Sequence, residues 1–234
     1  DPHLTSEIGT AFVLGLQGDD PRYLKIVSTP KHFAVNNEEH NRFECNPQVS
    51  EKQLREYYLV PYEALVKRGK AASIMSAYNA INGTPCTCNP WLLTKVLREE
   101  WGFDGYVVSD CGGPSLIYEA HEYVKAPETA ATLSIKAGLD LECGDEVYIE
   151  PLKKAYEMGM VTDEDIDTAA RRILTARMRL GIFDSTDNNP YAKISPDVIG
   201  SEKHQQIALQ TAREGIVLLK NNGILPLKQN RIRS

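Results

Sequence analysis

Apolar and polar positions along the first 183 residues follow two alternating patterns, short apolar runs and longer stretches with helical spacing. The short runs predict four strands, at residues 26–34, 71–77, 106–109 and 138–142. Helical spacing predicts helices at residues 4–17, 50–68, 89–97, 128–137, 148–158 and 163–180. Strands that alternate with helices of this length are typical of βαβ units in a parallel sheet.

Two of the predicted helices begin with a recognisable local signal. Ser50 opens the run Ser-Glu-Lys-Gln, in which Gln53 completes a capping box. Asn89-Pro90 places a proline in the first turn of another helix. The buried face of that second helix is predicted to consist of Leu92, Leu93, Val96 and Leu97.

A polar segment divides the chain into two parts. Residues 185–201, rich in Asp, Asn and Pro, predict a linker. Residues 1–184 hold four β/α units, whereas a complete eight-stranded barrel takes about 250 residues. Residues 202–234 resume with a helix and an apolar run, 216–219, which predicts the first strand of a second domain. The pattern therefore predicts an α/β fold, half of a parallel barrel followed by the opening of another domain.

Composition narrows the classes of partner. The net charge of −6 argues against nucleic acid and anionic membranes as partners, and no apolar run reaches the length of a membrane span. The five cysteines have irregular spacing and no accompanying histidine cluster, so we expect no metal site and mostly free thiols, with one disulfide left open. They are Cys45, Cys86, Cys88, Cys111 and Cys143.

Chemically versatile residues follow three successive predicted strands. Lys31 and His32 lie near the end of the first strand, Tyr78 follows the second, and Asp110 follows the third. The carboxyl ends of parallel barrel strands form the reaction face, so these side chains are expected to converge. Asp110 alone is equally explained as a turn or helix-capping residue, and a single histidine on a strand is more often a packed residue. Met75 has an equally good interpretation as barrel core.

The strand-end motifs resemble glycoside hydrolase family 3, the β-glucosidases and β-xylosidases. They are Lys31-His32-Phe33, Met75-x-x-Tyr78-Asn79 and Val108-Ser109-Asp110, and residues 180–184 and 212–221 are also similar to that family. The resemblance implies that residues 1–184 are the last four β/α units of a (β/α)₈ TIM-type barrel. It also implies that residues 202–234 begin an α/β sandwich domain, and that the protein is secreted or periplasmic.

The same resemblance implies a retaining β-glycosidase that uses no cofactor and acts on a β-linked oligosaccharide or an aryl glycoside. Asp110 would be the nucleophile that forms the covalent glycosyl-enzyme. Residues that would bind substrate are Lys31, His32, Met75, Tyr78, Cys111 and Arg42. In two-domain members the general acid/base is a glutamate of the second domain, outside this chain. The isolated chain is therefore expected to be inactive or nearly so.

The sugar is left open by two conflicting signals. The cysteine at position 111, directly after the candidate nucleophile, resembles the residue found there in β-xylosidases and arabinofuranosidases. The loop sequence Asn36-Asn37-Glu38 with Arg42 resembles that of β-glucosidases. The single-domain hexosaminidase branch is disfavoured because His40 has no matching Asp-x-His pattern.

Two other hypotheses about function are kept as alternatives to the glycosidase. One is a non-catalytic carbohydrate-binding or scaffolding half-barrel, which forms a homodimer through exposed sheet edges. The other is a barrel enzyme that uses Lys31 to form a Schiff base with a carbonyl substrate.

Overall fold

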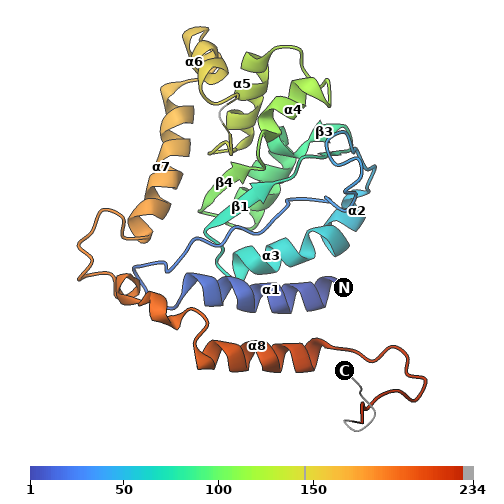
Figure 1. Cartoon of the computed structure of the whole chain (residues 1–234). Helices are drawn as coiled ribbons and strands as arrows, with labels where there is room; N and C mark the ends of the chain where they lie inside the picture. The colour runs from blue at the N-terminus through green and yellow to red at the C-terminus, as the bar shows by residue number, and fades with distance from the viewer. Residues whose placement is uncertain (145, 229–234) are drawn as a thin grey trace. The chain divides into compact units, whose positions relative to one another are not determined.

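A short parallel sheet lies at the centre of the first part of the chain (Figure 1). The computed structural model describes residues 1–144 and 146–228, which fall into two compact units divided after Tyr191. In the first unit, β1 (Ser73–Ser76) pairs in parallel with β4 (Tyr106–Ser109), in a register that sets Met75 opposite Val108. Parallel bridges join Phe33 to Ser76 and Val108 to Leu141. Four chain segments therefore lie side by side in sequence order, as predicted.

The first and last of these segments are less regular than the predicted strands. Along residues 28–33, the amides of Ser73 and Met75 donate to the carbonyls of Ser28 and Pro30, but Pro30 has no N–H to return. In the last segment, a carboxylate oxygen of Asp140 accepts the Val107 N–H at 2.8 Å. A side chain thus takes the place of a backbone acceptor, which shortens the ladder. The predicted strands 26–34 and 138–142 are correct in position and wrong in regularity.

Helices contribute far more residues to the unit than the strands do. α1 (Pro2–Gln17) begins at an N-cap, Asp1, and ends at Gly18, whose φ of 79° is readily adopted by glycine. The predicted capping box is confirmed at Ser50, and it starts a helical stretch composed of α2 (Glu51–Gln53), the π-helical η1 (Leu54–Tyr58) and α3 (Val60–Lys67). The others are π-helical η3 (Trp91–Glu100), α4 (Gly113–Glu119), α5 (Pro127–Ala137), α6 (Glu150–Glu157) and α7 (Asp163–Arg179).

The main core lies between the sheet and η3. The four predicted core residues of η3 are all completely buried, together with Ile74 of β1 and Val107 of β4. Phe33 joins this cluster and packs edge-on against Tyr62 of α3. This core fixes the strands, and with them the residues at their carboxyl ends.

Two elements near the strand ends were not predicted. A hairpin, β2 (Ala80–Ile81) with β3 (Thr84–Pro85), turns through Asn82-Gly83, both at positive φ. A short 3₁₀ turn, η2 (Cys86–Cys88), follows it. Both lie along the chain between β1 and η3, and α4, which was also not predicted, begins at Gly113 after β4.

The second unit, described by itself, consists mainly of α8 (Glu202–Gly215). Two 3₁₀ turns precede α8, η4 (Pro190–Lys193) at the boundary and η5 (Pro196–Val198). The apolar run 216–219 is exposed and forms no strand within the described residues. The prediction of a strand there is wrong for this structure, because a strand needs a neighbour to pair with.

Candidate active site

The carboxylate of Asp110 lies at the carboxyl end of β4, directly after the buried run that ends at Ser109. The backbone N–H of Asp110 donates to the carbonyl of Ser76 at 3.3 Å, so the residue still follows the sheet. Its Oδ1 accepts the N–H of Cys111 at 2.8 Å, which forms a tight turn. With 9% of its surface exposed, Asp110 is nearly buried and has a fixed direction.

His32 contacts the other oxygen of this carboxylate. Its Nε2 lies 3.0 Å from Oδ2 of Asp110, and its backbone carbonyl accepts the Tyr62 hydroxyl at 2.6 Å. Burial lowers the pKa of His32 below its ordinary value, and the charge of Asp110 opposes this effect only in part. The imidazole is therefore neutral at pH 7 and donates its Nε2–H to the carboxylate.

Tyr78 reaches the same turn from the end of β1. Its hydroxyl donates to the carbonyl of Cys111 at 2.9 Å, and the His121 Nε2 lies 2.8 Å from the Tyr78 carbonyl. Burial and the nearby negative charge of Asp110 raise the pKa of Tyr78 to about 12. The phenol thus stays protonated and remains a hydrogen-bond donor beside the carboxylate.

Arg42 connects the 36–47 loop to this group of residues. Its guanidinium lies 5.3 Å from the centre of the Tyr78 ring and 4.9 Å from that of Phe43. The Phe43 ring packs edge-on against Tyr78 with centroids 5.0 Å apart, and Glu39 holds Arg42 through an ion pair of 2.8 Å. The loop therefore contacts Tyr78 at the strand ends through the edge-on ring of Phe43 and the guanidinium of Arg42.

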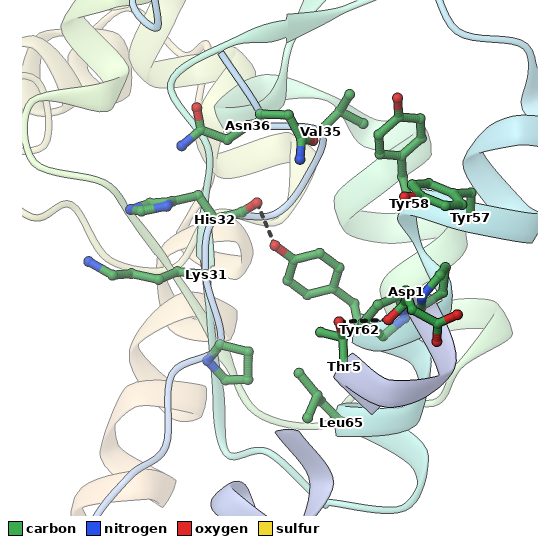
Figure 2. Close-up of a pocket in the computed structure, with 14 residues that line it drawn as sticks. Asp1, Thr5, Lys31, His32, Val35, Asn36, Tyr57, Tyr58, Tyr62 and Leu65 are labelled. Atoms are coloured by element: carbon green, nitrogen blue, oxygen red, sulfur yellow. Dashed lines mark hydrogen bonds between the residues drawn. The ribbon is translucent and has the colours of Figure 1, made fainter. Parts of the chain in front are cut away.

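A cavity of about 490 Å³ borders His32, and Asp110 does not belong to its lining. Its lining includes Lys31 and His32 together with aromatic rings from the 57–62 region. Figure 2 shows the side chains of Lys31 and His32 extending to one side of their segment, while the Tyr62 ring lies on the other. The peptide bonds Lys31–His32 and Phe33–Ala34 are cis.

Met75 is the predicted site residue that lies within β1 itself. It is half-buried on β1, and strand alternation sets it on the sheet face opposite Ile74, which belongs to the core. Its cross-strand neighbour on that face is Val108, two residues before Asp110. Met75 therefore lies on the sheet face opposite the main core, close to the carboxyl end of β4 where Asp110 follows.

The structure thus brings five predicted residues into one connected group and adds three that sequence reasoning missed. The five are Asp110, His32, Tyr78, Cys111 and Arg42, and the three are Phe43, His121 and Cys143. The Sγ atoms of Cys111 and Cys143 lie 2.6 Å apart. Both cysteines follow the ends of neighbouring parallel segments, and this spacing was a usable signal.

Among residues 1–144 and 146–228, no cluster of three or more His, Cys, Asp or Glu side chains is arranged to hold a metal ion. Within the same described ranges, no helix combines the length and the apolar character needed to cross a membrane.

Residues 1–176 match the family model described as the glycosyl hydrolase family 3 N terminal domain. The chain belongs to glycosyl hydrolase family 3. The matched domain of this family has a TIM-barrel-type fold, in agreement with the parallel sheet and its covering helices. The family expectation from the strand-end motifs is confirmed.

Relatives of the family 3 chain carry the names of β-xylosidases and β-glucosidases. Probable β-D-xylosidase 7 of Arabidopsis thaliana is 39% identical over 248 residues, covering 100% of this chain and 32% of the relative. A solved GH3 exo-β-xylosidase (XlnD) in complex with a xylobiose aziridine probe aligns with a TM-score of 0.90 and 35% identity, over 97% of this chain and 30% of its own. β-Glucosidase 3B from Thermotoga neapolitana in complex with glycerol aligns with a TM-score of 0.78 and 37% identity, over 98% and 30%. The chain spans less than a third of the length of these relatives.

Proposed function

We propose that the protein to which this chain belongs hydrolyses terminal, non-reducing β-linked glucosyl or xylosyl residues with retention of configuration, and that Asp110 is the nucleophile. The observation that carries the proposal is the nearly buried carboxylate at the end of β4, hydrogen-bonded to a neutral His32 at 3.0 Å. Such a carboxylate is held in one orientation without being neutralised by a cation at close range.

The chemistry of retention needs a nucleophilic carboxylate on one face of the sugar. An oxygen of Asp110 would form a bond to the anomeric carbon while the glycosidic bond breaks and the leaving oxygen takes a proton from a general acid. Water would then attack the same carbon and release Asp110. Oδ1 of Asp110 accepts the Cys111 N–H and Oδ2 accepts from His32, and a carboxylate oxygen has two lone pairs, so these two contacts are compatible with attack.

The neighbouring residues would bind the sugar. Lys31 and Arg42 supply N–H donors, and the Nδ1 of the neutral His32 is left as an acceptor for a sugar hydroxyl. The protonated Tyr78 hydroxyl keeps the turn in place. Met75 and Cys111 would provide the less polar surface on which a sugar ring rests. The names of the relatives support a β-xylosyl or β-glucosyl substrate.

We also propose which domains of the glycosidase the segments of this chain belong to. Residues 1–184 would be the last four units of the (β/α)₈ barrel, residues 185–201 the linker, and residues 202–234 the beginning of a sandwich domain. The sequence order of the four parallel segments supports the first part of this assignment.

The nucleophile is tested by trapping on the 234-residue chain with 2,4-dinitrophenyl 2-deoxy-2-fluoro-β-xyloside and the matching β-glucoside. Dinitrophenolate leaves without protonation, so the reaction does not depend on a general acid. We expect one fluoroglycosyl group on the peptide that contains Asp110, with either sugar or both. Asp110→Asn should remove the label, and Asp104→Asn, an exposed carboxylate six residues earlier, should keep it. A folded wild-type chain that takes no label from either reagent, or a label that survives Asp110→Asn, contradicts the proposal.

One observation favours the alternative of a self-associating half-barrel. α1 exposes Leu4, Ile8 and Phe12 at intervals of four residues, so they form one apolar stripe. In this alternative the stripe would pack against the same stripe of a second copy. Sedimentation velocity would then detect a dimer at micromolar concentration that Phe12→Ser converts to monomer. A wild-type chain that stays monomeric removes the alternative.

A further inference from the structure

We propose that Cys111 and Cys143 form a redox couple, in which oxidation to a disulfide ties the turn after β4 to the segment that follows Leu141. Their Sγ atoms lie 2.6 Å apart although the residues are 32 positions apart in the chain. A disulfide bond is about 2.05 Å long, so bonding needs a sulfur displacement of only about half an ångström.

The backbone around the two thiols is already joined on both sides. The N–H of Cys143 donates to the Ser109 hydroxyl at 3.0 Å, and the N–H of Gly112 donates to the Cys143 carbonyl at 2.8 Å. The N–H of Ser109 donates to the Leu141 carbonyl at 2.9 Å. Because these bonds hold the segments in register, disulfide formation does not require the segments to be rearranged.

The two thiols have different chemical roles. Cys111 is exposed, whereas Cys143 is half-buried and its pKa is raised to about 11 by the contact with Cys111 and by burial. The Cys111 thiolate would attack a sulfur of a small-molecule disulfide, such as oxidised glutathione, and release one glutathione thiolate. Cys143 would then lose its proton and attack the sulfur of Cys111, releasing the second glutathione. Two protein thiols are oxidised and one glutathione disulfide is reduced to two thiols.

Two of the three other cysteines are poorly suited to compete. Cys86 and Cys88 are buried, and burial raises the pKa of each to about 12. A buried thiol with little thiolate reacts slowly with oxidants, so the oxidation is expected to select the 111–143 pair. The selectivity follows from thiol geometry and does not depend on the role of Asp110.

The effect of the bond falls on the turn that carries Asp110. The Cys111 N–H donates to Asp110, and the Cys111 carbonyl accepts the Tyr78 hydroxyl. A covalent tie at Cys111 therefore restrains the orientation of the carboxylate. This consequence, unlike the redox couple itself, rests on the proposed function.

The couple is tested on the 234-residue chain equilibrated in glutathione buffers of increasing oxidised fraction, with thiol alkylation and peptide mass mapping. We expect the loss of two thiols, a cross-linked 111–143 peptide, and a melting temperature higher by on the order of 10 °C in the oxidised chain. Cys143→Ser should trap one glutathione on Cys111, and Cys45→Ser should behave like the wild type. A wild-type chain that keeps glutathione on Cys111, or that forms other cross-links in equal yield, overturns the couple.

A second measurement separates the couple from its effect on Asp110. The rate of labelling by the fluoroglycoside is compared in the oxidised and the reduced chain, and we expect at least about a twofold faster reaction when oxidised, because a restrained nucleophile is better oriented. Equal labelling rates with a confirmed cross-link would contradict the proposed effect on Asp110 and leave the redox couple itself supported. The absence of label in both states would contradict the proposed function and leave the cross-link to be judged by mass mapping.

Discussion

Two aspartates on neighbouring segments of the sheet, Asp110 and Asp140, have opposite environments. Asp140 is 4% exposed, and its carboxylate bonds Arg98 at 2.6 Å and Arg172 at 2.8 Å. Asp110, at 9%, contacts a neutral imidazole, the N–H of its own turn and the neutral phenol of Tyr78. Burial is thus similar at the two positions, and the charge of the partners differs.

The difference shows how one residue type serves stability at one place and chemistry at another. Arg98 also donates to the carbonyls of Gly105 and Gly138, so the Asp140 cluster joins η3 to the amino end of β4. Burial raises the pKa of Asp140, but two guanidinium groups in contact stabilise the charged form. A carboxylate paired in this way is unavailable to a substrate, whereas the neutral partner of Asp110, at the carboxyl end of β4, is compatible with its proposed role as nucleophile. Barrel proteins divide stability and catalysis between the same two ends.

The largest expected effect belongs to the carboxyl end. Asp110→Asn should lower the rate of fluoroglycoside labelling by about 10⁴-fold or more, because the amide is a far weaker nucleophile. The free energy of unfolding should change by less than about 1 kcal/mol, since the partner of Asp110 is neutral. Labelling kinetics measure the expected loss of rate, and urea denaturation of the same variant measures the expected small change in stability. A large loss of stability would show that Asp110, like Asp140, has a structural role in the fold.

The converse variant, Asp140→Asn, should lower the free energy of unfolding by about 3 kcal/mol, because it removes the buried carboxylate that pairs with two partly buried guanidinium groups. Urea denaturation measures the change. The surface variant Glu51→Gln, which breaks an exposed ion pair with Arg55, should cost less than about 1 kcal/mol. Equal costs for the two variants would show that burial of the Asp140 cluster adds nothing.

Sequence patterns predicted the regular elements of this fold well, because local signals and burial agree there. The capping box at Ser50 and the apolar face of η3 are examples. The hairpin around Asn82-Gly83 was missed although this dipeptide is a strong turn signal between apolar residues. Segment 26–34 is less regular than its apolar pattern indicates, because Pro30 has no backbone N–H to donate to the ladder.

The candidate site was predicted in part for a similar reason. Residues that follow a strand directly, such as Asp110 and Tyr78, are found by their position at the strand end. Cys143 and His121 contribute through contacts across the sheet and from a loop, and a single sequence does not state such pairings. The role of Asp140 as an ionic anchor also depends on Arg172, 32 residues away.

A smaller effect should come from the hydroxyl that supports the Asp110 turn. Tyr78→Phe removes the donor to the Cys111 carbonyl and keeps the ring against Phe43 and Arg42. We expect a loss of about 1 kcal/mol in unfolding free energy and up to about a tenfold slower labelling. Tyr123→Phe, on an exposed tyrosine, is the matched control. Unchanged labelling would show that the turn holds Asp110 without this bond.

The smallest effect concerns the pH dependence that His32 imposes on the same turn. Burial, with Lys31 and Arg42 nearby, lowers the pKa of folded His32 below 6.5, so the unfolded chain takes up this proton first as the pH falls. The contribution of His32 is full above pH 6.5 and declines as the pH falls from 6.5 toward the folded pKa. Urea denaturation at several pH values should therefore give a shallower decline below pH 6.5 for His32→Gln than for the wild type or for His40→Gln, an exposed histidine. An identical decline in all three would mean that His32 is as accessible to protons as in the unfolded chain, and that the neutral donor to Asp110 is lost.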